Sequence, residues 1–252
     1  MRYFVRFSYV GTDFHGSQTQ PNAITVQQTM ENVFSTVLRQ PVALTFAGRT
    51  DAGVHATNMF AHFDIHQLPI TNHQLRDRLN GLLPPSISLS AILPVTDDAH
   101  ARFSATARTY EYRITTRKDP FRQHLVTRVA PGLDFAAMNR AAAYLLGTHD
   151  FASFCRTHTD VKTTLCSVSE AQWFPNEDGS EALFRITADR FLRNMVRAIV
   201  GTLFEVGRGK RSPEDILAIL SAHSRPAAGQ SAPADGLFLT CITYPSTVTY
   251  NP

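Results

Sequence analysis

The sequence predicts an α+β protein made of two similar halves. The chain has 252 residues, of which 43% are hydrophobic, enough to bury one large core or two smaller ones. Segments with the two-residue period of strands alternate with amphipathic helical segments. The order of strand then helix occurs in both halves, which suggests an internal pseudo-repeat. We expect residues 1–104 and 105–252 to form two domains.

The first half opens with a strand at residues 3–9 and a turn or loop at residues 10–16. A helix follows, because apolar residues between 26 and 38 recur at helical spacing. Thr25 and Gln28 provide the capping-box pattern at its start. This helix is expected to cover a sheet.

Two further strands are predicted at residues 42–46 and 59–65, where apolar side chains alternate. The glycine-containing loop between them therefore joins two strands. A second helix begins at the cap residue Thr71 and ends before Pro84, which supplies no backbone donor. The apolar side chains of this helix are Leu75, Leu79 and Leu82.

The second half repeats the order of elements. Residues 108–114 are predicted to form a strand, and residues 134–146 a helix that Gly147 ends. Residues 166–174 and 183–189 flank a turn-forming segment and should pair as a hairpin.

The clearest helical pattern runs from residue 190 to 206 and has a wide apolar face. On a helical wheel, the opposite narrow stripe carries Arg190, Arg193, Asn194, Arg197 and Gly201. Ser212 and Pro213 then start a shorter helix, and a linker at residues 225–235 leads to a last strand at 237–244.

The net charge of +3 is weak support for an acidic partner, but the charges are unevenly distributed. Residues 102–128 hold seven Lys and Arg against two acidic residues, and residues 185–211 show the same balance. Two basic stretches on a nearly balanced chain suggest a face for phosphates.

The sequence gives little support for a membrane protein or a metalloprotein. No segment approaches the roughly 18 apolar residues of a membrane span, and the start lacks the apolar core of a signal peptide. The three cysteines have neither the number of a disulfide framework nor the close pairing of a zinc site. We expect a cytoplasmic protein with reduced thiols.

Asp51 is the strongest candidate for chemistry. It lies between Gly48 and Gly53, and two glycines allow backbone conformations that hold a short acid at a fixed position facing a substrate. A carboxylate that attacks as a nucleophile or acts as a base must be ionised, and a nearby guanidinium favours that form. Arg49 or Arg197 could provide the guanidinium.

The loop around Asp51 resembles the signature of the tRNA pseudouridine synthase A family, and further blocks match in order along nearly the whole chain. The matching blocks are Ala47–Ala56, Gly11–Gln27 in parts, Ala101–Ala105 with Arg108–Tyr112, Gly147–Phe154, Phe191–Gly201 in parts and Ala232–Leu237. So many blocks in one order are highly specific.

The resemblance implies an isomerase that converts uridine to pseudouridine in the anticodon stem-loop of tRNA, at positions 38, 39 and 40, without cofactor or metal. It also implies the pseudouridine synthase fold, in which two α+β halves share a continuous antiparallel sheet flanked by helices around a central basic cleft. Members of the family act as homodimers, and the partner of this chain would be tRNA.

The resemblance assigns three catalytic residues. Asp51 would be the nucleophile, attacking ribose C1′ or uracil C6 or assisting a glycal route. Tyr110 matches the tyrosine that stacks on the target uracil and takes part in proton removal. Arg197 matches the basic residue that pairs with the catalytic carboxylate.

Four further residues are candidates for substrate binding. Arg49 resembles the arginine that holds the flipped nucleotide, and Leu237 the apolar wall of the uracil pocket. His55 in the signature and Arg193 in the basic stripe complete the set. The family commonly has an acidic residue where Val10 stands and a tryptophan where Ser17 stands, which are the two departures in the first loop.

Three alternatives compete with this assignment. His55, His62 and His66 suggest a metal enzyme, but His62 and His66 would lie about 13 Å apart along a strand, too far for one zinc ion. A catalytically silent RNA-binding module would use Asp51 only to shape a turn. A pseudouridine synthase acting on other tRNA positions or other RNAs would keep the chemistry and change the target.

Overall fold

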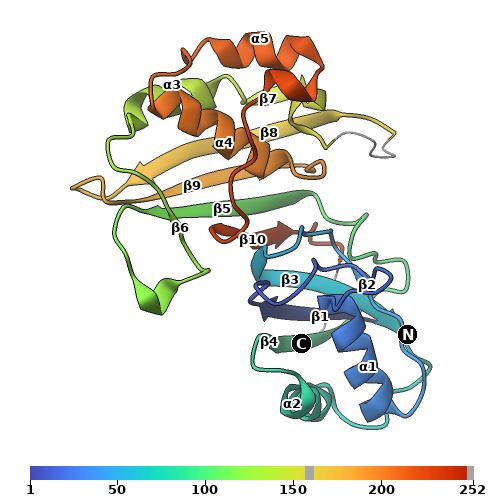
Figure 1. The fold of residues 1–252 in the computed structure, drawn as a ribbon. Coiled ribbons are helices and arrows are strands. Elements are labelled where there is room, and N and C mark those ends of the chain that lie inside the picture. The colour runs from blue at the N-terminus through green and yellow to red at the C-terminus, as the bar shows by residue number, and fades with distance from the viewer. Residues whose placement is uncertain (157–161, 249–252) are drawn as a thin grey trace. The chain divides into compact units, whose positions relative to one another are not determined.

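The computed structural model describes residues 1–156 and 162–248, which form two compact units. The first unit consists of residues 1–106 together with the described residues from 239 on, and the second of residues 107–238. Each unit contributes strands and helices of its own (Figure 1), and the strands belong to one sheet in the order β4-β1-β3-β10-β5-β9-β8-β7. The α+β class predicted from the sequence is confirmed.

The strands of the first unit have the order β4-β1-β3-β10, in which β1 pairs antiparallel with both β3 and β4, and β2 pairs antiparallel with β3. Its elements are β1 (Arg2–Tyr9), α1 (Val26–Leu38), β2 (Thr45–Phe46), β3 (His55–Asp64), α2 (Asn72–Leu82), β4 (Ile87–Val95) and most of β10 (Leu237–Thr243). The sequence placed the last strand in the second domain. In the structure, residues 239–243 of this strand group with the first unit, and β10 lies beside β3.

Local side-chain chemistry explains where the helices of this unit begin. The Thr25 side chain accepts a hydrogen bond from the amide of Gln28 at the start of α1, and Thr71 with Gln74 forms a complete capping box at α2. Phe34 of α1 packs edge-on against Phe63 of β3, with ring centroids 5.4 Å apart. The aromatic core thus holds α1 against the sheet.

The second unit has the strand order β5-β9-β8-β7, and its paired strands run antiparallel except for β6, which is parallel to β5. Its elements are β5 (Ala107–Thr115), β6 (Thr127–Arg128), α3 (Phe135–Ala143), β7 (Gly147–Asp150), β8 (Leu165–Pro175), β9 (Glu181–Ala188), α4 (Met195–Gly207) and α5 (Asp215–Ala222). Trp173 of β8 is buried between Phe184 of β9 and Phe204 of α4, so α4 packs on the sheet.

Several element boundaries differ from the prediction. α4 begins at Met195 rather than at residue 190, because Asn194 adopts the left-handed conformation with φ 67° and interrupts a helical path. α5 begins at Asp215, later than the expected start at Ser212, and α3 ends at Ala143. The strand β4 was not predicted at all.

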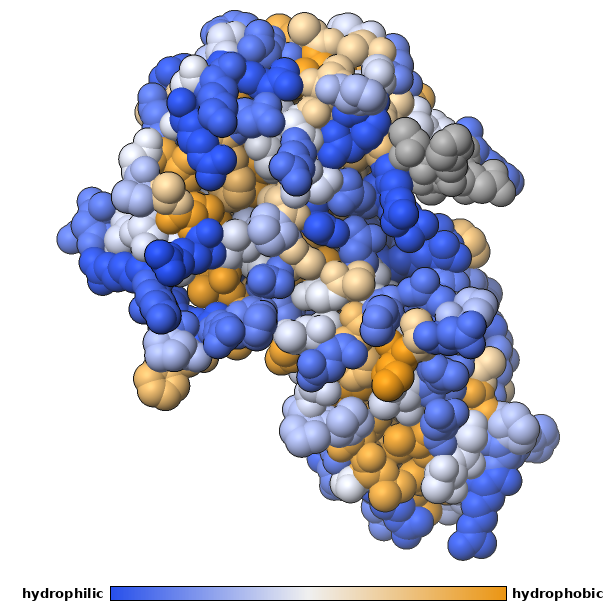
Figure 2. All heavy atoms as spheres, viewed as in Figure 1, coloured by the Kyte–Doolittle hydropathy of each residue, from blue (hydrophilic) through white to orange (hydrophobic). Residues whose placement is uncertain are grey.

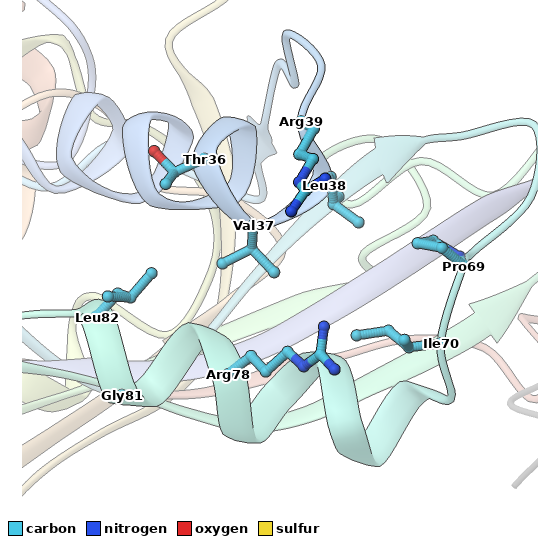
Figure 3. Close-up of a pocket in the computed structure, with 9 residues that line it drawn as sticks. All are labelled: Thr36, Val37, Leu38, Arg39, Pro69, Ile70, Arg78, Gly81 and Leu82. Atoms are coloured by element: carbon cyan, nitrogen blue, oxygen red, sulfur yellow. The ribbon is translucent and has the colours of Figure 1, made fainter.

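The predicted apolar face of α2 is only partly buried. Leu75 and Leu79 are fully buried, whereas Leu82 is 57% exposed and lines a groove of about 650 Å³ between α1 and α2 (Figure 3). Apolar surface gathers over this region of the first unit (Figure 2). No helix of the described residues is long and apolar enough to cross a membrane.

Candidate active site

Asp51 lies in the loop that joins β2 to β3, as the sequence predicted. The loop ends in a turn in which the amide of Val54 donates to the carbonyl of Asp51 at 3.1 Å. Gly53 has φ 78°, a conformation that favours glycine, whereas Gly48 does not adopt a positive φ. Of the two glycines in the motif, only Gly53 is therefore required by backbone conformation. The Asp51 side chain is half-buried.

The residue before Asp51 is held by three of its atoms. The amide of Thr50 donates to Oγ of Ser17 at 2.8 Å, and the Thr50 carbonyl accepts from the amide of Ser17 at 3.2 Å. The hydroxyl groups of Thr50 and Tyr9 are 2.8 Å apart and share a hydrogen bond in the interior. These contacts fix the backbone that leads directly into Asp51.

His55, predicted to bind substrate, is buried and supports this loop. It is 1% exposed, and its Nδ1 accepts the amide of Gly11 at 2.9 Å. A Cβ on Gly11 would lie 2.0 Å from the carbonyl oxygen of Val54, so the two loops touch through their backbones. His55 therefore supports the backbone of both loops, and its contact with substrate stays a prediction.

Three further residues of the two loops differ in how exposed their side chains are. Ser17, where the family commonly has tryptophan, is completely buried, while Val10 is 39% exposed. Arg49 is exposed beside Asp51 in the chain, in keeping with a substrate contact. Burial and backbone bonding make Ser17 part of the loop's support.

Arg197 lies on α4 in the second unit and is half-buried. Its Nε donates to the carbonyl of Ala232 at 2.8 Å, and the amide of Ala232 donates back to the carbonyl of Arg197 at 2.9 Å. Asn194 donates through its side chain to Oγ of Ser231 at 2.7 Å. Asn194 and Arg197, two residues of the predicted stripe, are thus bonded to Ser231 and Ala232.

Tyr110 lies on β5, opposite Ile186 of β9, and is half-buried. Its ring meets the ring of Phe191 edge-on, with centroids 5.1 Å apart and an interplanar angle of 84°. Phe191 therefore restricts the orientation of the Tyr110 ring. An aromatic face held in this way is suited to stacking on a base.

Leu237 is 4% exposed and closes a turn in which its amide donates to the carbonyl of Ala234 at 2.9 Å. Close by, the buried hydroxyl of Tyr112 lies 2.7 Å from Oγ1 of Thr127 and donates to the carbonyl of Pro233 at 2.9 Å. Burial raises the pKa of Tyr112 well above its usual value, so this hydroxyl remains a donor. Residues 232–237 are therefore fixed between α4 and β5.

Arg193 precedes α4 and is exposed. Its carbonyl accepts the amide of Arg156 at 3.0 Å, and Arg108 donates to the carbonyl of Asp189 at 2.8 Å in the same unit. Residues 189–193 are therefore held by contacts from two other parts of the second unit's sequence, one through the Arg156 main chain and one through the Arg108 side chain.

The predicted site residues divide between the two units. Arg49, Asp51 and His55 belong to the first unit, and Tyr110, Arg193, Arg197 and Leu237 to the second. The groove between α1 and α2 carries no acidic side chain in its lining and is not a candidate for this chemistry. Within residues 1–156 and 162–248, no group of three His, Cys, Asp or Glu residues could hold a metal ion.

Comparison with known proteins decides the family. The family model described as tRNA pseudouridine synthase matches residues 6–104 and 141–245. The chain belongs to the tRNA pseudouridine synthase family. Asp51, Arg197 and Leu237 fall inside the matched ranges, and Tyr110 lies between them.

Close relatives of this tRNA pseudouridine synthase family member carry the name tRNA pseudouridine synthase A. The protein of Porphyromonas gingivalis is 52% identical over 246 residues, covering 97% of this chain and 98% of its own length. That of Bacteroides fragilis is 49% identical over 247 residues, with 98% of each chain covered. That of Bacteroides thetaiotaomicron is 50% identical over 248 residues, covering 98% and 92%.

Sequence reasoning missed the supporting residues of the family's signature loop. Tyr9 read as an ordinary strand residue and Ser17 as a departure from the family pattern, although both contact Thr50. Ala232 was noted only as part of a matching block. These roles depend on contacts between residues far apart in the chain, and no local pattern signals them.

Proposed function

We propose that this chain isomerises uridine to pseudouridine in the anticodon stem-loop of tRNA, at positions 38, 39 and 40. The observation that carries the proposal is the near-complete coverage of relatives about 50% identical and named tRNA pseudouridine synthase A. The fixed loop that presents Asp51 supports it. The net reaction breaks the N1–C1′ bond of uridine, forms a C5–C1′ bond and moves one proton from C5 to N1.

Asp51 is the proposed nucleophile of this reaction. The hydrogen bonds on Thr50 and the turn from Asp51 to Val54 give its backbone a fixed position, as a nucleophile requires. Its half-buried side chain remains within reach of a substrate. The carboxylate attacks ribose C1′ or uracil C6, or assists a glycal route.

Arg197 and Tyr110 complete the proposed catalytic set. Arg197 supplies the positive charge that keeps the nucleophile ionised, and the bond from its Nε to Ala232 fixes the plane of its guanidinium group. Tyr110 stacks on the uracil and takes part in proton removal at C5. Its contact with Phe191 supports the first role by limiting ring rotation.

Substrate binding in this proposal uses both charge and apolar surface. Arg49 holds the nucleotide that has been flipped from the stem, because the reacting atoms are enclosed in a stacked helix. Arg193 contacts the tRNA backbone, and Leu237 forms the apolar wall of the uracil pocket. The basic stretches grip phosphates in a basic cleft.

The experiment is to incubate the purified protein with unmodified tRNA and to map pseudouridine along the RNA. We expect conversion in the anticodon arm by the wild type and none by Asp51→Asn, with tRNA affinity nearly unchanged. Asp98→Asn, which alters an exposed carboxylate in a loop, is the matched control and should keep full activity. Full activity of Asp51→Asn would refute the catalytic assignment.

Two other outcomes separate the alternative functions. Conversion elsewhere in the tRNA would preserve the chemistry and reject the positions. Binding of tRNA without any conversion would point to a silent RNA-binding relative.

The remaining proposals concern the state of the protein in the cell. We propose that it acts in the cytoplasm as a homodimer and needs neither cofactor nor metal. Sedimentation should give twice the mass of one chain, and activity should survive chelation. A monomer that is fully active, or activity lost to chelator and restored by a metal ion, would overturn the respective proposal.

A further inference from the structure

We infer that Ser17 is a positioning residue for the reaction, acting through Thr50 on Asp51. The inference rests on the proposed function, since it concerns the residue that precedes the proposed nucleophile. Ser17 lies 34 positions before Asp51 in the sequence. It touches the loop through both its side chain and its backbone.

The bond from the Thr50 amide to the Ser17 hydroxyl is a buried contact. Ser17 is 0% exposed and Thr50 8%, so water cannot readily take over as the acceptor. Removing the hydroxyl would leave a buried amide without its partner, at a cost of about 1–3 kcal/mol. The loop would relieve this cost by moving the Thr50 peptide, and Asp51 would move with it.

Ser17 is itself tied to a rigid element. Its carbonyl accepts the amide of Gln27 at 2.9 Å, and the carbonyl of Gly16 accepts the amide of Val26 at 3.3 Å, both at the start of α1. The bond to Thr50 therefore connects the catalytic loop to a helix that packs on the sheet. A loop anchored to a helix is placed more accurately than one anchored to another loop.

The packing around Ser17 leaves little room for an alternative arrangement. Gly16 has φ 96°, and a Cβ at this position would lie 2.8 Å from the carbonyl oxygen of Thr50. The Gly16 backbone thus lies close to the Thr50 carbonyl, while the Ser17 hydroxyl accepts the Thr50 amide. With the glycine contact and the hydroxyl both in place, Thr50 is held from two directions.

The test compares Ser17→Ala with Ser35→Ala. The Ser35 hydroxyl accepts the amide of Val42 at 3.0 Å, which is the same kind of bond in the same unit but away from the Asp51 loop. Single-turnover rates at saturating tRNA, dissociation constants for tRNA and melting temperatures are measured for both. Amide exchange at Thr50 is followed by nuclear magnetic resonance in the wild type and in Ser17→Ala.

We expect Ser17→Ala to slow the single-turnover rate roughly tenfold, because small displacements of a reacting group are costly in rate. Its dissociation constant should stay within about twofold of the wild type. Ser35→Ala should keep the wild-type rate, even if both variants melt at similarly lowered temperatures. Ser17→Cys, which offers a weaker acceptor, should give an intermediate rate.

Equal rates for Ser17→Ala and Ser35→Ala would overturn the inference, as would a loss of tRNA affinity that accounts for the whole loss of rate. If the wild type converts no uridine, the proposed function fails. Thr50 exchange then decides the structural part alone: faster exchange in Ser17→Ala supports the tether, and unchanged exchange rejects it.

Discussion

Arg197 and Ala232 are joined by two hydrogen bonds that run in opposite directions, one through the guanidinium Nε at 2.8 Å and one through the Ala232 amide at 2.9 Å. The reciprocal pair fixes both the side chain of Arg197 and the segment that covers it. Gly201, one turn further along α4, lets this segment approach: a Cβ there would lie 1.7 Å from the carbonyl oxygen of Gln230.

Gly201→Ala should therefore destabilise the protein by roughly 1–3 kcal/mol, because the added methyl group would clash with the backbone of Gln230, which cannot rotate away as a side chain could. The displaced segment should also weaken the support of Arg197 and lower the isomerisation rate. Gly81→Ala in α2 is the matched control, since nothing lies within 4 Å of its added Cβ. It should stabilise by up to about 1 kcal/mol. Urea unfolding measures both, and a Gly201→Ala protein as stable as the wild type would contradict the packing argument.

Stability should fall in mildly acidic solution because of His62. Burial lowers the pKa of His62 from 6.5 to about 4, helped by the charges of Arg2 and His100 and opposed by Asp64. Below pH 6.5, His62 becomes protonated in the unfolded chain but stays neutral in the folded protein. The free energy of unfolding therefore decreases as the pH falls toward 4. The loss between about pH 7 and about pH 5 should be roughly 2 kcal/mol.

His62→Asn provides the check on this dependence. Its side-chain oxygen can accept the amide of Ala101, as Nδ1 of His62 does at 3.1 Å, but it does not titrate. Urea unfolding across this pH range should give a flatter profile for His62→Asn than for the wild type. His73→Asn, at an exposed site, should leave the profile unchanged. The same slope in His62→Asn as in the wild type would show that other groups cause the effect.

Arg193→Ala should weaken tRNA binding mainly at low salt. If its exposed guanidinium contacts one phosphate, the slope of log affinity against log salt should become shallower by about one. Arg76→Ala is the control, because the Arg76 guanidinium is paired with Asp77 at 2.7 Å. Filter binding over a range of salt concentrations measures both slopes. An Arg193→Ala slope equal to that of the wild type would remove this residue from the phosphate surface.

The sequence predicted best those features that depend on neighbouring residues. Thr25 and Thr71 cap helices as expected, since a cap needs only a side chain and an amide three residues away. The strands around Asp51 follow from alternating burial. β4 was missed although buried Ile87 and Leu89 alternate with exposed Ser88 and Ser90, which is the period of a strand that pairs with β1.

The structure departs from the local sequence pattern where contacts between residues far apart in the chain determine conformation or burial. The helical sequence pattern runs without a break from residue 190 into α4. In the structure, however, Asn194 leaves the helical conformation, and its side chain donates a hydrogen bond to Ser231, 37 positions away. His55 matched a signature, yet the structure buries it against Gly11. The sequence could single out Asp51 as the candidate nucleophile, but it could not show which residues hold the Asp51 loop in place.

The first unit is assembled from both ends of the chain, since residues 239–243 of β10 group with residues 1–106. A ribosome makes protein from the N-terminus, so residues 107–238 are synthesised while the first unit still lacks its part of β10. Until then the edge of β3 has no partner on that side, and an exposed strand edge invites pairing with other chains. The Asp51 loop thus belongs to the unit whose sheet is completed last during synthesis, and a chain truncated before β10 would carry the Asp51 motif on an unfinished sheet.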